Sequence, residues 1–215
     1  GLTVLNDVVD DEVKSDSMPG LIEGATLYGD LMGYPLWTNC QLLIYRKDLF
    51  EDGANKTAFK AEYGYELAPP TTWEEYADMA KFFTKDDMYG TALHGLGHHA
   101  PTQFLNFASQ AGAQPLVLGE DGMPNVDGKA YVDALTYMQQ MQNNGVIPPD
   151  TLAIGADECN ELFGNEKIAM QLNWAHLYAS SYEKLGGDKV GVAAIIAGSS
   201  GVGSISGPWY MSLMN

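Results

Sequence analysis

The sequence predicts a layered α/β fold, because short strand patterns alternate with helix patterns of ten or more residues. Three stretches carry this prediction: the apolar run 42–45, the alternating pattern 167–173 and the β-prone run 190–196. The helix patterns between them each have one apolar face. A chain of 215 residues is long enough to bury a core of this kind.

The first thirty residues predict an acidic, amphipathic helical region that breaks at the Pro19-Gly20 pair, with Asp16 or Ser17 capping the next segment. Turn signals fill residues 28–33. The run 42–45 then predicts a short buried strand, since it is apolar, β-prone and bounded on both sides.

Residues 47–51 favour a helix, and another helix begins after the Pro69-Pro70 pair, where Thr71 and Thr72 each stand three positions before a glutamate. Trp73 lies on the apolar face of this second helix. We therefore expect Trp73 to be a core residue and not a ligand contact.

Residues 89–93 predict a short strand, and the stretch HGLGHHAPTQ at 94–103 predicts a loop because it contains two glycines and a proline. Helices are expected at 104–111 and 128–144, with a surface turn at 119–127 between them. The second helix carries an apolar stripe, and its members are Tyr131, Ala134, Leu135, Met138 and Met141.

In the last third, Asp157 is expected to cap a short helix that ends at Gly164. Trp174 follows the strand pattern 167–173, and a helix is expected at 176–185. After the strand 190–196, a glycine-rich stretch leads to Trp209, which we expect to be exposed.

Composition excludes several function classes. The formal net charge is -17 and Arg46 is the only arginine, so neutralisation of nucleic-acid or anionic-lipid phosphates is not expected. No stretch approaches the roughly 20 apolar residues that cross a bilayer, so we expect no membrane insertion. Cys40 and Cys159 are compatible with one disulfide or with two free thiols.

No catalytic or cofactor motif is present, so we expect no cofactor and no catalytic residue. His94, His98 and His99 have a spacing that suits a metal on a helix, but Gly95 and Gly97 argue against a helix, so we expect no metal site. Asp157 and Glu158 fit an acid/base pair of a carbohydrate-active enzyme, or a helix cap and a first-turn carboxylate. We favour the cap.

Several segments, taken together and in order, resemble one family. They are LYGDLMGYPLWTN, LLIYRKDLFE, APPTTWEEYADMAKFF, YGTAL, FLNFASQAGA, NNGVIPP, ADECNELFGNEKIAMQLNW, VGVAAI and GPWYMSL. The family is that of the extracellular solute-binding proteins of ABC importers, in particular the sugar-binding group that includes maltose-binding protein. Each segment alone is weak, whereas their common order and spacing make the resemblance specific.

The resemblance implies a two-lobed, type II-like periplasmic-binding-protein fold with a sugar held between the lobes. Residues 1–42 would be part of lobe one, 43–190 lobe two, and 191–215 the return crossing with another part of lobe one. Family members are much longer, so lobe one is expected to be incomplete in this chain. The resemblance also implies a periplasmic or extracellular location, with or without a lipid anchor, a monomer, and a membrane permease as partner.

The resemblance and the positions of aromatic and planar polar side chains together indicate ligand contacts. Aromatic rings stack on sugar faces, and planar polar groups satisfy hydroxyls. For Trp174 the alternative is a tryptophan that plugs a strand-to-helix corner. The expected contacts are Trp37, Thr38, Asn39, His98, His99, Gln103, Asp157, Asn173, Trp174, Gly207 and Trp209.

The implied function is binding of a mono- or oligosaccharide for import. Two alternatives stay open. One is a binding protein for a polyol or another small solute, and the other is a carbohydrate-active enzyme that uses Asp157 or Glu158.

Overall fold

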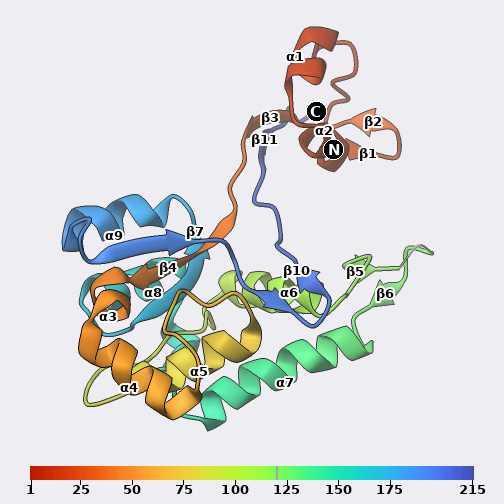
Figure 1. Ribbon diagram of the computed structural model, residues 1–215. Coiled ribbons are helices and arrows are strands. Elements are labelled where there is room, and N and C mark those ends of the chain that lie inside the picture. Colours follow the sequence, from red (N-terminus) through yellow and green to blue (C-terminus); the bar gives the residue numbers. More distant parts are fainter. Residues whose placement is uncertain (120) are drawn as a thin grey trace. The chain divides into compact units, whose positions relative to one another are not determined.

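The computed structural model describes residues 1–119 and 121–215, which form two compact units (Figure 1). Unit 1 comprises residues 1–40 and 206–215, and unit 2 comprises residues 41–205. Assignment of the chain to lobes with boundaries at 42 and 190 stays a prediction.

Unit 1 contains two short helices and two β-ribbons. The helices are α1 (Asp11–Asp16) and α2 (Pro19–Gly24); β1 (Thr26–Leu27) pairs with β2 (Asp30–Leu31), and β3 (Tyr34–Trp37) pairs with β11 (Trp209–Met211), both antiparallel. The turn expected at 28–33 is the β1–β2 hairpin, where Tyr28 and Gly29 have positive φ. The core of unit 1 is small: its buried apolar residues are Leu5, Val9, Ala25 and Leu31.

The capping prediction for this region is wrong. Asp10 caps α1 by accepting a hydrogen bond from the Val13 N–H at 2.9 Å, and Asp16 is the last residue of that helix. Met18 precedes α2 and makes no side-chain cap bond. Pro19 starts α2 because its fixed φ suits the first helical position and it has no N–H to satisfy.

Unit 2 is built on a three-stranded sheet in which β4 (Gln41–Arg46) lies between β7 (Met170–Trp174) and β8 (Val190–Ala193), antiparallel to both. The strand expected at 42–45 is thus confirmed. Side chains alternate between the faces of β4. Leu43 belongs to the larger core cluster, with Phe107 of α6 (His99–Gln110). Ile44 belongs to a smaller cluster with Cys159 and Phe163 of α8 (Ala156–Gly164). Both faces of the sheet are therefore covered.

The remaining elements of unit 2 surround this sheet (Figure 1). The helices are α3 (Lys47–Glu51), α4 (Gly53–Tyr63), α5 (Trp73–Phe83), α6 (His99–Gln110), α7 (Lys129–Asn143), the 3-10 helix η1 (Thr151–Ala153), α8 (Ala156–Gly164) and α9 (Leu177–Leu185). Two short hairpins complete the unit: β5 (Val117–Leu118) with β6 (Pro124–Asn125), and β9 (Ala197–Gly198) with β10 (Gly201–Val202). Helix α4 was not expected from the sequence.

The start of α5 follows the predicted capping pattern. The Thr72 side chain accepts a hydrogen bond from the Glu75 N–H at 3.2 Å, and the Glu75 carboxylate accepts one from the Thr71 N–H at 2.7 Å. The helix therefore begins at Trp73, as the sequence indicates.

Several other expectations need correction. Residues 89–93 form no strand, because after the bridge between Tyr89 and Ile168 the Thr91 N–H turns to the Val146 carbonyl. Strand β8 ends at Ala193, and β7 begins at Met170 and includes Trp174. On α7, Leu135 is exposed and Tyr137 is buried in its place.

A further correction concerns Asp157, which is the second residue of α8 and not its cap. The N-cap is Gly155, and Glu158 serves this end of the helix by accepting the Gly155 N–H at 2.9 Å. Of the surface turn expected at 119–127, residue 120 lies outside the described residues; β5 and β6 flank that position.

Both cysteines are free thiols, with Cys40 exposed and Cys159 buried. Within the described part of the chain, every helix is too short or too polar to cross a bilayer.

Candidate functional site

One edge of the unit 2 sheet gathers several of the predicted contacts. Strands β7 and β8 both end at this edge, since each runs antiparallel to β4, and Gln41 at the start of β4 lies opposite Trp174 at the end of β7. The segment after Tyr89 approaches the same edge, because Tyr89 pairs with Ile168 in parallel. Open α/β sheets bind ligands at such strand ends.

The first turns of α6 and α8 meet beside this edge. A Cβ added to Gly155 would lie 2.9 Å from Cδ2 of His99 and 2.9 Å from Oε2 of Glu158, so a larger residue here would displace one of these side chains. The backbone N–H groups of Gly95 and Leu96 both donate to the Ile154 carbonyl, at 2.8 and 3.0 Å. These contacts fix the loop before α6 against the segment before α8.

The expected loop at 94–103 is therefore only partly right. It ends at His98, the N-cap of α6, while His99 and Gln103 lie in the helix. The helix tolerates Pro101 because the backbone N–H groups of a first turn have no helical partner to lose.

His94 and His99, near these helix starts, are held toward their neutral form. Burial, and secondarily the neighbouring His99, lowers the pKa of His94 from 6.5 to about 4. Burial and then His98 also lower the pKa of His99. His94 is only 2% exposed, so at neutral pH it is a buried, uncharged imidazole.

Glu158, in contrast, is held toward its charged form. Its own backbone N–H and that of Gly155 stabilise the carboxylate and lower its pKa. A general acid at neutral pH needs a raised pKa. The geometry thus gives Glu158 a capping role and does not suit it to proton donation.

Two predicted contacts are buried and bonded within unit 2. The Gln103 Oε1 accepts the His94 backbone N–H at 2.7 Å. Asn173 donates from Nδ2 to the Ala156 carbonyl at 2.9 Å and to Gln171 Oε1 at 2.8 Å, and its Oδ1 accepts the Trp174 N–H at 2.9 Å. Both side chains hold the loop and helix starts in place.

The other predicted residues of unit 2 reach the surface. His98 and Asp157 are exposed, and His99 and Trp174 are partly exposed. Asp157 also lines a groove of about 470 Å³ between α8 and α9. Across the described residues, no group of three His, Cys, Asp or Glu side chains has the geometry to hold a metal ion.

The remaining five predicted contacts lie together in unit 1. Trp37 and Trp209 face each other across the β3–β11 ribbon, with ring centroids 6.2 Å apart and planes 16° apart. They are 45% and 61% exposed. Asn39 and Gly207 exchange two backbone hydrogen bonds, at 3.2 and 2.9 Å, and Thr38 between them and the tryptophans is exposed. The ribbon thus carries an aromatic surface with polar groups at its end.

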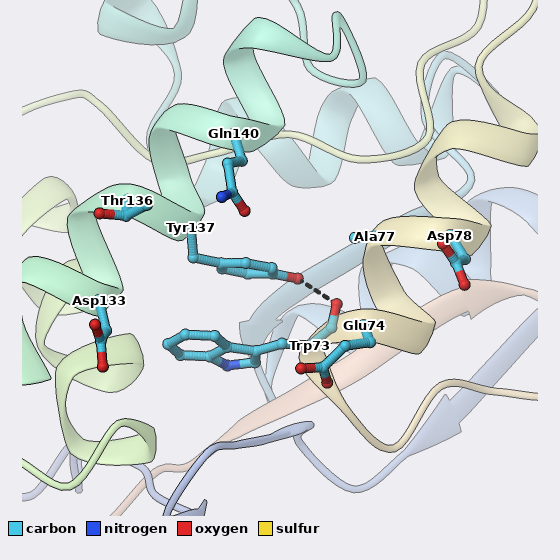
Figure 2. Close-up of a pocket in the computed structure, with 8 residues that line it drawn as sticks. All are labelled: Trp73, Glu74, Ala77, Asp78, Asp133, Thr136, Tyr137 and Gln140. Atoms are coloured by element: carbon cyan, nitrogen blue, oxygen red, sulfur yellow. Dashed lines mark hydrogen bonds between the residues drawn. The ribbon is translucent and has the colours of Figure 1, made fainter.

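Trp73 has the core role that the sequence indicates. Its ring stacks on Tyr137 with centroids 4.4 Å apart, its Nε1 donates to Gln110 Oε1 at 2.6 Å, and its carbonyl accepts the Tyr137 hydroxyl at 2.8 Å. Figure 2 shows this stacked pair beside a pocket of about 380 Å³ between α5 and α7. None of the predicted contacts lines that pocket.

Three polar residues of unit 2 that the sequence did not single out as contacts each retain buried atoms without a hydrogen-bond partner among the described residues. These are both amide atoms of Gln41, Nε2 of His94 and Nδ2 of Asn106. The available signals in the sequence were a glutamine at the start of an apolar strand and an asparagine among apolar residues, in FLNFA. The histidine spacing in the sequence marks His94 only as a candidate metal ligand.

Residues 2–213 match the family described as bacterial extracellular solute-binding protein, and the chain belongs to that family. The family resemblance seen in the sequence is confirmed.

Among relatives, the chain is 27% identical over 213 residues to a probable ABC transporter-binding protein of Deinococcus radiodurans, covering 94% of this chain and 47% of the relative. It is 25% identical over 165 residues to a mannitol-binding protein of Pseudomonas aeruginosa, covering 74% and 35%. Among solved structures, maltose-bound MalE3 of T. maritima matches with a TM-score of 0.79 and 26% identity, over 99% of this chain and 52% of that one. The expected α/β fold is confirmed, and the chain spans about half the length of these relatives or less.

Proposed function

We propose that the protein is the substrate-binding component of an ABC importer, that it binds an uncharged carbohydrate, and that it delivers this ligand to a membrane permease. The observation that carries the proposal is the strand-end edge of unit 2, where Trp174, two helix starts and a neutral histidine come together. The maltose in the similar solved structure supports a sugar as ligand.

The single arginine supports an uncharged ligand. Arg46 is 4% exposed and its guanidinium is paired with Asp48 at 2.6 Å and with Glu166 at 2.9 Å. An anionic ligand is best bound by a free guanidinium fork. This chain has no second arginine to provide one.

The proposed contacts form two sets. In unit 2 they are Trp174, His98, His99 and Asp157, with Gln103 and Asn173 supporting them from behind. In unit 1 they are Trp37, Thr38, Asn39, Gly207 and Trp209. A two-lobed protein would favour its closed form when ligand is bound if that form binds the ligand more tightly, because a ligand shifts an equilibrium by its differential affinity for the two states.

We further propose a monomer that acts in the periplasm or outside the cell, with or without a lipid anchor, and that catalyses no reaction. The role of Glu158 as a helix cap with a lowered pKa supports binding without chemistry. Chromatography of an oligosaccharide incubated with the protein tests this point, and release of a shorter product would contradict it.

A polyol is the second candidate ligand, because one similar protein is a mannitol-binding protein. The exposed tryptophan pair distinguishes the candidates. A sugar ring offers a flat apolar face for stacking, whereas an open-chain polyol does not. Trp209→Ala should therefore weaken sugar binding about tenfold or more and polyol binding much less.

Calorimetric titration of the full chain with maltose, D-mannitol and gluconate tests the proposal. We expect heat of binding and thermal stabilisation with maltose, D-mannitol or both, and none with gluconate. A ligand at 100 times its dissociation constant should stabilise the folded state by about 2.7 kcal/mol. Binding of gluconate alone, or of none of the three, would contradict it.

A further inference from the structure

Helix α6 turns a polar stripe toward the interior of unit 2. His99, Gln103, Asn106 and Gln110 follow one another at i, i+4, i+7 and i+11, which places them on one helix face. Gln103, Asn106 and Gln110 are each 2% exposed or less. Buried amides of this kind are nearly always fully hydrogen-bonded.

Gln110 meets that rule and Asn106 does not. Gln110 accepts the Trp73 Nε1–H at 2.6 Å and donates to the Gly203 carbonyl at 3.0 Å, so both ends of its amide are used. Asn106 accepts the Ile205 N–H at 2.6 Å through Oδ1, but its Nδ2 has no partner within the described residues. The polar stripe is therefore fully hydrogen-bonded at Gln110, but it retains an unpaired donor at Asn106 among the described residues.

His94 stands next to this stripe. Its backbone N–H is bonded to Gln103, one turn before Asn106, and its ring centroid lies 6.1 Å from that of His99. The Nε2 of His94 is buried and has no partner in the described part of the chain.

Gln41 adds a third open group on the same side of the sheet. Gln41 stands two positions before Leu43 on β4, so the two side chains lie on the same face of the sheet. Leu43 shares a core cluster with Phe107 and Ala108 of α6. Neither amide atom of Gln41 has a partner among the residues described. Three buried side chains on the α6 side of the sheet therefore carry unused hydrogen-bonding atoms.

We propose that Gln41, His94 and Asn106 are specificity-determining residues of the proposed site, and that they recognise hydroxyl groups of the ligand; this inference rests on the proposed function. Asn106 offers a donor, Gln41 offers a donor and an acceptor, and a neutral imidazole nitrogen serves as either. A hydroxyl group both donates and accepts, so it can satisfy such a mixed set. An anion would leave the Gln41 oxygen unpaired, and a cation would leave the Asn106 N–H groups unpaired.

The test compares variants in the full chain by calorimetric titration with maltose and with D-mannitol, alongside the unfolding midpoint of each. His94→Phe removes the hydrogen-bonding atoms and keeps a ring. Asn106→Asp keeps the oxygen that accepts the Ile205 N–H and removes the donor. Each should weaken binding about tenfold or more, which is the effect expected for one lost hydrogen bond to a ligand.

Gln110→Leu is the matched control, since Gln110 lies on the same helix face but bonds only within unit 2. It should lower the unfolding midpoint and leave the dissociation constant within about twofold. If the histidine or asparagine variant fails to fold, Gln41→Met provides the test, because it replaces an unpaired amide by an apolar side chain of similar length and should weaken binding while folding normally.

The outcomes separate this inference from the function on which it rests. Wild-type binding that persists unchanged in the folded His94, Asn106 and Gln41 variants would overturn the inference and leave the proposed function standing. Absence of binding by the wild type to both compounds would overturn both.

Discussion

The two faces of the unit 2 sheet bury polar side chains in different ways. On the face covered by α8 and α9, Asn160 Oδ1 accepts hydrogen bonds from Gln171 at 2.9 Å and from Ser181 at 2.6 Å, and its Nδ2 donates to Ser180 at 2.8 Å. Gln171 in turn accepts from Asn173. On the α6 face, Gln41, His94 and Asn106 keep atoms that have no partner among the described residues.

This difference suggests that one face of the sheet stabilises the fold and that the other binds a ligand. A closed polar network connects β7 to two helices, and its hydrogen bonds offset the free-energy cost of burying its polar groups. An open group costs stability, on the order of 1 to 3 kcal/mol, unless another molecule supplies the partner. A face that tolerates several open groups is therefore the one on which a ligand is expected, and the closed face is expected to serve the fold.

The largest effect on stability should come from removing hydrogen bonds on the face covered by α8 and α9. Asn173→Leu leaves the Trp174 N–H, the Gln171 oxygen and the Ala156 carbonyl without their present partner. We expect a loss of about 3 kcal/mol in the free energy of unfolding, measured by urea denaturation. Gln142→Leu, at an exposed position of α7, is the control and should change it by less than about 0.5 kcal/mol. A loss below about 1 kcal/mol for Asn173→Leu would show that the network is not closed in solution.

An intermediate effect should come from acid, through His94 on the open face. Its folded pKa of about 4 lies below the unfolded value of 6.5. Below pH 6.5 the imidazole is therefore protonated in the unfolded chain and stays neutral in the folded chain. Stability from this group is present above pH 6.5 and is lost as the pH falls toward 4. We expect a loss of about 2 kcal/mol between about pH 7 and pH 4.5.

His94→Phe isolates this contribution, because the other titrating groups remain. The free energy of unfolding of the variant should fall less steeply with acid than that of the wild type. Parallel curves for the two proteins would mean that His94 titrates normally when folded.

The smallest effect should come from removing an open group. Gln41→Met deletes two unpaired buried atoms and keeps an apolar stem of similar length, so the free energy of unfolding should stay equal or rise by up to about 1 kcal/mol. Thermal unfolding measures this. A clear loss of stability would indicate that the Gln41 amide is bonded in the folded protein.

The sequence was sufficient where a local pattern alone determines the structure. The run at 42–45, the helix start at Trp73 and the core role of Trp73 follow from periodicity and capping. The start of α6 could not be predicted in this way, because Gly95, Gly97 and Pro101 are typical of a loop. In the structure the helix begins at His99, before the proline, where His99 lies beside Gly155.

The open polar groups were beyond sequence reasoning for a similar reason. Nothing in the local pattern distinguishes Gln110, which finds two partners 37 and 93 positions away, from Asn106, which finds only one among the described residues. Whether a buried amide is satisfied depends on contacts between distant segments. Trp174, by contrast, stands at the end of a strand that the alternation pattern at 167–173 already indicates.

The side-chain amide signals of the protein, followed by ¹H–¹⁵N NMR while maltose or D-mannitol is added, test the contrast between the two faces most directly. We expect the signals of Gln41 and Asn106 to shift with ligand and saturate, while those of Asn160 and Asn173 stay in place. Saturation by ligand with Gln41 and Asn106 unmoved, or with the shifts confined to Asn160 and Asn173, would contradict it.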